Sequence, residues 1–82
     1  MPTGPSQHNN LALVYMDQGD LESAEPLILR AMELSATYAP AHNNLGTIRH
    51  RQGRFDETEA PLRRAIELDP NLSAAYAKQN SR

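Results

Sequence analysis

The sequence predicts an all-α fold: two helix–turn–helix hairpins stacked as a solenoid, followed by the first helix of a truncated third hairpin. The main observation is an internal repeat of 34 residues. When the chain is shifted by 34 positions, 11 of the 34 pairs from Pro5/Ala39 to Tyr38/Leu72 are identical. In each copy, apolar residues recur at the helical spacing of three to four positions, and a glycine-containing turn divides the copy in two. A period of this length is typical of helical repeat arrays.

The first hairpin is expected over residues 6–38, after a tip at residues 1–5 that is disordered or vector-derived. Its first helix begins with Ser6 as the N-cap. Residues 18–20 end that helix, because Gly19 supplies the left-handed conformation with which helices commonly finish. The second helix of this hairpin carries one apolar stripe, formed by Leu21, Ala24, Ile28, Ala31, Met32 and Leu34.

The second hairpin is expected over residues 39–72, with Pro40 as an early helical residue and Gly53 in the turn. Residues 73–82 restart a first helix and stop before its turn. Pro26 and Pro61 lie beyond the first turn of their helices, where a proline removes a hydrogen bond. We expect each to cause only a slight kink, because the helix around it starts late.

Composition and charge exclude several classes of protein. Eight basic and ten acidic residues give a net charge of −2, which argues against a general binder of nucleic acid or acidic membranes. The chain has no cysteine and therefore no disulfide or thiolate metal site. Its longest apolar run, residues 11–16, is far too short to span a bilayer. The compartment stays open, with the cytoplasm favoured.

The repeat resembles the tetratricopeptide repeat, a 34-residue helix–turn–helix with the signature W-x2-L-G-x2-Y followed by Ala, a bulky residue, Ala and Pro. The residues that carry this resemblance are Leu45, Gly46, Ala65 and Pro70 in the second copy and Leu11, Tyr15, Ala24 and Ala31 in the first. The sequence departs from the signature where His8 and His42 occupy the tryptophan position, Arg49 the tyrosine position, Thr58 an alanine position and Ala36 the proline position.

In the tetratricopeptide family, the first helix of every hairpin lines a concave groove that binds peptides or proteins. The resemblance therefore implies a peptide-binding groove and a protein–protein interaction module. Its lining residues would be Asn9, Asn10, Leu13, Met16 and Asp17 from the first copy, Asn43, Asn44, Thr47, His50 and Arg51 from the second, and Lys78 from the third.

Two asparagines are the most suggestive of these residues. Asn10 and Asn44 are equivalent, and a side-chain amide both donates and accepts hydrogen bonds, so it can hold a peptide unit without reading a side chain. The segment 42–46 is similar to the repeats of O-linked N-acetylglucosamine transferases and related bacterial proteins, in which an asparagine ladder holds the substrate polypeptide. The alternative is that these amides bond only to the neighbouring hairpin or to water. The family's carboxylate clamp is disfavoured, because only two of its five positions match.

The sequence contains no pattern typical of catalysis, and we expect no enzyme activity, metal or cofactor. His8 and His42 stand one repeat apart in the position of a packing aromatic, which favours a structural role over a metal site. No nucleophile–base pair or glycine-rich phosphate loop is present. A role as the substrate-recruiting arm of a glycosyltransferase rests on the resemblance alone.

Self-association is the main alternative function. Stacked hairpins bury their apolar faces only against neighbours, and about three repeats with polar caps are normally needed. We expect Leu62 and Ile66 to be only partly covered. We also expect the chain to be either a fragment of a longer array or a homo-oligomer, and such an oligomer could form by exchange of helices between copies. Charge is unevenly spread, with net −4 over residues 5–38, 0 over 39–72 and two further basic residues after that. Acidic and basic ends could therefore meet, in an association that salt would weaken.

Overall fold

The computed structural model describes residues 4–72. This range contains four complete α-helices and one short 3₁₀ helix, residues 70–72 are helical as well, and no strand is present in it. The elements are α1 (Pro5–Asp17), α2 (Leu21–Leu34), α3 (Ala39–Arg51), η1 (Phe55–Glu57) and α4 (Glu59–Leu68). The predicted all-α class is confirmed. The expectations for residues 1–3 and 73–82, including the truncated third helix and Lys78, lie outside the described residues.

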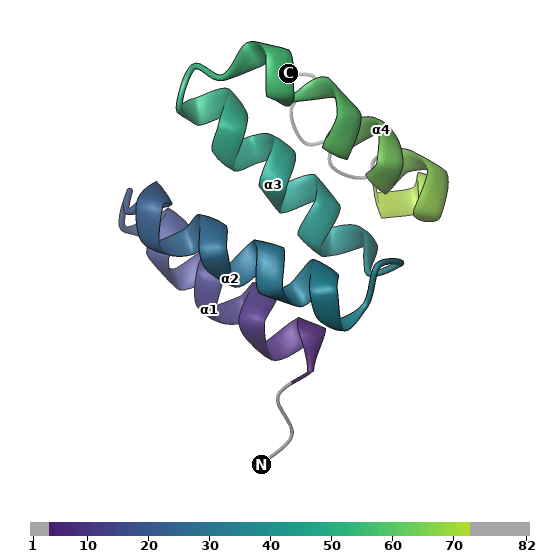
Figure 1. Ribbon diagram of the computed structural model, residues 1–82, viewed down its shortest axis with the longest axis horizontal. Coiled ribbons are helices and arrows are strands. Elements are labelled where there is room, and N and C mark those ends of the chain that lie inside the picture. Colours follow the sequence, from purple (N-terminus) through teal and green to yellow (C-terminus); the bar gives the residue numbers. More distant parts are fainter. Residues whose placement is uncertain (1–3, 73–82) are drawn as a thin grey trace.

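Helix α3 lies between the first hairpin and α4 (Figure 1). It packs against α2 on one side and against η1 and α4 on the other, while α1 packs mainly against α2. The two hairpins are thus stacked through α2 and α3. Within the described part of the chain, no helix is long and apolar enough to cross a membrane.

Each hairpin turns at a glycine in the left-handed region, with φ +80° at Gly19 and +77° at Gly53. This is the conformation that lacks a steric penalty only for glycine. The next residue then closes the turn: Asp20 N–H donates to Tyr15 O at 2.9 Å, and Arg54 N–H donates to Arg49 O at 2.8 Å. The glycine turns predicted from the sequence are therefore present in both copies.

The start of α1 differs from the prediction. Gly4, not Ser6, is the N-cap residue, and Pro5 is the first helical residue. Proline suits this position because its φ is already helical and its missing N–H would have no partner there. The Gln7 side chain adds a contact, since its Oε1 accepts a hydrogen bond from Gly4 N–H at 2.9 Å.

The second helices of the two hairpins are built differently. Where α2 is continuous, the second copy has η1 followed by α4, and Thr58 stands between them. The Thr58 hydroxyl donates to Arg54 O at 2.9 Å, a bond that Ala24 in the first copy could not make. Pro61 is therefore the third residue of α4, where no intrahelical N–H is needed. The expected late start holds for Pro61, whereas Pro26 lies inside α2.

The core is assembled largely from small residues that let the helices approach closely. Ile28 and Ile48 are the largest fully buried side chains, and they are packed among alanines and Leu45. Gly46 is buried against α4, where a Cβ atom would lie 2.5 Å from Leu62 Cδ2. Its equivalent, Ala12, is fully buried in the first hairpin. Burial of this apolar surface is the main stabilising contribution to the stack.

Candidate functional site: the seam between α1 and α3

The first helices of the two hairpins meet along a seam that polar groups cross at two points. Asn44 Nδ2 donates to Asn9 Oδ1 at 2.8 Å, and farther along Arg51 donates to the Met16 carbonyl oxygen at 3.4 Å. Each bond joins residues 35 positions apart. We call the residues that flank these bonds and remain at least partly accessible the seam face: Asn10, Leu13, Asp17, Asn43, Asn44, Thr47 and Arg51.

Two of the predicted groove residues are buried beneath the seam instead of lining it. Asn9 is only 3% exposed, because its side chain is covered by α3 and accepts the bond from Asn44. Met16 belongs to the hydrophobic core cluster. The expectation that these two side chains line the groove is therefore wrong. The repeat pattern shows which residues share a helix face, but it does not show which of them the neighbouring helix covers.

Three of the predicted residues are exposed on α1, and two of them are polar. Asn10, Leu13 and Asp17 share one side of the helix because they are separated by three and four positions. Among the described residues, neither Asn10 nor Asp17 makes a side-chain hydrogen bond to a residue distant in sequence. A ligand could therefore reach an unengaged amide and a carboxylate on this helix.

On α3 the predicted residues divide between two sides. Asn43, Asn44 and Thr47 are half-buried, and the Thr47 hydroxyl donates to Asn43 O at 3.1 Å. His50 instead contacts η1, with its ring in a T-shaped contact with Phe55 at a centroid distance of 5.3 Å. Arg51 is exposed at the same end of the seam as Asp17. The structure thus brings most of the predicted residues together and separates His50 from them.

The two repeated histidines have structural partners. His42 is buried, and its Nε2 lies 2.8 Å from the carbonyl oxygen of Ala36 in the loop between the hairpins. His8 Nδ1 lies 3.1 Å from Gly4 O. Within residues 4–72, no group of three His, Cys, Asp or Glu side chains is placed to hold a metal ion.

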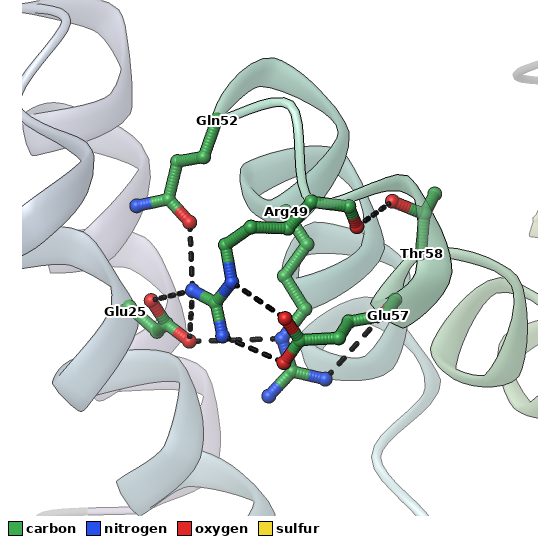
Figure 2. Close-up of polar contacts among 6 residues, drawn as sticks. Glu25, Arg49, Gln52, Glu57 and Thr58 are labelled. Atoms are coloured by element: carbon green, nitrogen blue, oxygen red, sulfur yellow. Dashed lines mark hydrogen bonds and ion pairs between the residues drawn. The ribbon is translucent and has the colours of Figure 1, made fainter.

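An ion-pair network on the other side of the stack was not foreseen from the sequence. Arg54 bonds to Glu25 of α2 at 2.9 Å and to Glu57 of η1 at 2.9 Å, and its third contact is the Gln52 side chain at 2.8 Å (Figure 2). Arg49 approaches the same Glu25 carboxylate at 3.6 Å. The bond to Arg54 holds the pKa of the Glu57 carboxyl below its ordinary value, and the same bond raises the pKa of Arg54. Through Glu25 of α2, this network joins the first hairpin to the second.

A second unforeseen feature is an open, mostly apolar cleft of about 410 Å³ on the outer side of the second hairpin. Its lining residues include His50, Phe55, Leu62 and Ile66. The sequence indicated partial exposure of Leu62 and Ile66 but not the role of Phe55. The signal was present in the repeat, because Phe55 and Ile66 are the equivalents of Leu21 and Met32, which pack against the core.

Comparison with known families decides the classification. The model of the tetratricopeptide repeat family matches residues 6–71, which cover the stacked hairpins and the seam. The chain belongs to the tetratricopeptide repeat family. A search of curated proteins found no matching relative, so nothing supports the narrower likeness to the repeats of O-linked N-acetylglucosamine transferases. Tetratricopeptide repeats generally mediate protein–protein interactions.

Proposed function

We propose that this tetratricopeptide chain binds an extended segment of a partner protein along the seam face. The observation that carries the proposal is the pair of equivalent amides, Asn10 and Asn44, presented one repeat apart on an accessible surface. An extended strand offers alternating N–H and C=O groups, and side-chain amides can bond to both. The partner is therefore held mainly through its backbone.

The bond between Asn44 and Asn9 supports this proposal. Asn44 uses one of its two N–H groups on Asn9 and keeps the other N–H and its oxygen for a ligand. The bond also fixes the direction of the Asn44 amide before a ligand arrives, which lowers the entropic cost of binding. Asn10 presents the same group without that restraint.

The spacing of the two amides suits an extended peptide. Packed helices lie about 8–10 Å apart. An extended chain advances about 3.3 Å per residue, so that distance corresponds to two or three residues. Leu13 adds apolar contact area beside Asn10, while Asp17 and Arg51 place opposite charges at one end of the seam. These charges would orient a partner segment that carries charge at that end.

The proposal is tested with peptides selected from a displayed library of unstructured sequences against the full chain. Calorimetry then compares the unmodified protein with Asn10→Ala, which removes an exposed amide. We expect a five- to tenfold weaker affinity, about the contribution of one hydrogen bond. Gln18→Ala is the matched control, because Gln18 is an exposed amide at the C-cap of α1 and is not one of the residues of the seam face.

Modification of the peptide itself tests the mode of recognition. N-methylation of single peptide bonds should weaken binding strongly at the positions that the asparagines hold, whereas alanine substitution of side chains should have smaller effects. If no peptide is selected, or if Asn10→Ala and Gln18→Ala bind equally well, the seam face is not the binding site.

A further inference from the structure

The two ends of the stack match each other, and we propose that the chain binds a second copy of itself head to tail. The N-face consists of Leu11 and Val14 of α1, with the adjacent His8 and Leu27. The C-face consists of Phe55, Leu62 and Ile66, with the adjacent His50. In the proposed junction, α1 of one copy lies against α4 of another, as α3 lies against α2 within one chain.

The N-face on α1 is exposed, although the equivalent surface of α3 is buried inside the molecule. Leu11 is 47% exposed and Val14 51% exposed, whereas the equivalent residues of α3, Leu45 and Ile48, are 3% and 0% exposed. The difference arises because α2 packs on α3. Beside Leu11, an open cleft of about 200 Å³ extends to His8 and Leu27.

The C-face shows the opposite half of the same interface. Phe55 is 63% exposed and Ile66 48% exposed, although the equivalent residues of the first hairpin, Leu21 and Met32, pack against the core cluster. Both side chains line the cleft of about 410 Å³. Large exposed apolar patches of this kind mark interaction surfaces.

A second copy fits the C-face because α1 repeats the chemistry of α3. Leu11, Val14 and His8 correspond to Leu45, Ile48 and His42. The amide pair is repeated as well: Asn10 of the incoming copy corresponds to Asn44, and Asn43 of the receiving copy corresponds to Asn9. The chain's own segment 73–82 is a poorer match in sequence, since it has Gln79 and Arg82 where α3 has Leu45 and Ile48.

Electrostatics make this junction weaker than the one inside the chain. Glu25 of α2 pairs with Arg49 and Arg54. At the junction, Glu59 of the receiving copy takes the place of Glu25. Tyr15 and Asp20 of the incoming copy take the places of Arg49 and Arg54, so the two ion pairs are replaced by one contact between like charges, Glu59 and Asp20. The interface is also heterologous, and such interfaces form open chains unless the rotation closes a ring. The association should therefore rise continuously with concentration.

Sedimentation and light scattering of the full chain, from micromolar to millimolar concentration, test the proposal. We expect the weight-average mass to rise with concentration. Val14→Lys on the N-face and Ile66→Lys on the C-face should each lower the association constant at least about tenfold, because each buries an unpaired charge at the junction. Leu29→Lys is the control: Leu29 is an exposed residue of α2 outside both faces, and its equivalent is Arg63. Circular dichroism checks that all variants remain folded.

Mixing the two face variants gives the decisive result. The Val14→Lys protein keeps an intact C-face and the Ile66→Lys protein keeps an intact N-face, so the mixture should form capped one-to-one dimers. A chain that stays monomeric throughout, association that Leu29→Lys reduces as much as the face variants do, or a mixture with no dimer would each overturn the proposal.

Discussion

Asn44 of α3 donates a hydrogen bond of 2.8 Å to Asn9 of α1, and this bond joins the first helices of the two hairpins. Asn9 is almost completely buried, while Asn44 is half-buried at the edge of the seam face. The same bond therefore contributes to the stacking of the repeats and to the position of a proposed ligand-binding amide. Its removal should affect stability in a measurable way.

Asn44→Ala should lower the free energy of unfolding by about 1–3 kcal/mol, because it leaves the buried Asn9 oxygen without a partner. A double-mutant cycle with Asn9→Ala should give a coupling energy of about 1 kcal/mol. Urea unfolding followed by circular dichroism measures all four proteins. Purely additive losses would mean that the two side chains do not interact.

The ion pairs of Glu25 should matter more than those on exposed helix surfaces. Its carboxylate is mostly covered and serves both Arg49 and Arg54, and Arg49 Nε is buried. Glu25→Gln should therefore cost roughly 1 kcal/mol of stability, after allowance for solvent screening. Glu59→Gln is the matched control, because it breaks only the exposed pair with Arg63 and should cost less. Equal losses in thermal unfolding would contradict the role assigned to Glu25.

The pH dependence of stability should include a contribution from Glu57. Its pKa is lowered in the folded chain, chiefly by the hydrogen bond from Arg54, so the unfolded chain binds the proton more tightly. The resulting stabilisation is present above the ordinary pKa of 4.5 and is lost as the pH falls through the lower folded value. Glu57→Gln should flatten the acid limb of the curve of thermal midpoint against pH.

Glu67→Gln is the control for that experiment, because Glu67 forms another (i, i+3) pair, with Arg64, on the exposed surface of α4. An acid limb that is equally steep in the unmodified protein and in Glu57→Gln would show that the Arg54–Glu57 bond does not contribute.

The effect of Gly46→Ala on stability should change sign when the neighbouring side chain, Leu62, is shortened. In the unmodified protein the added Cβ would lie 2.5 Å from Leu62 Cδ2 and 2.6 Å from Cγ, and we expect a net loss of about 1 kcal/mol after the gain in helix propensity. In a Leu62→Ala background the clash with the leucine side chain is removed and only the closer-than-usual contact with Thr58 O, at 3.3 Å, remains, so Gly46→Ala should be stabilising by less than about 1 kcal/mol. Chemical denaturation of the four proteins measures both effects. The same sign in both backgrounds would contradict the packing account.

Much of the fold could be predicted from the sequence because repetition makes each local signal appear twice. Gly19 and Gly53 both turn the chain, and the equivalent residues Ala31 of α2 and Ala65 of α4 are both fully buried. Local features were less predictable. Examples are the start of α1 at Pro5 and the division of the second copy into η1 and α4. Such features depend on single hydrogen bonds, for example the bond from Thr58 to Arg54 O, and the pattern of apolar residues does not predict them.

The site could be predicted only in part, because exposure depends on packing between the hairpins. Asn10 and Asn44 are accessible as expected, whereas Asn9 and Met16 are covered where α1 meets α3 and α2. The network around Glu25 joins residues 29 positions apart, so no local motif indicates it. The exposed faces at the two ends follow from the sequence only when each residue is compared with its equivalent in the other copy.

The proposed binding of an extended polypeptide to the seam face is tested most directly by nuclear magnetic resonance. A selected peptide is titrated into the ¹⁵N-labelled chain, and the side-chain amide signals of Asn10 and Asn44 are followed with the backbone signals. We predict the largest shifts at Asn10, Leu13, Asn44 and Arg51, and small shifts at Phe55 and Ile66. Saturable shifts confined to the end faces, with the Asn10 and Asn44 amides unchanged, would contradict the account.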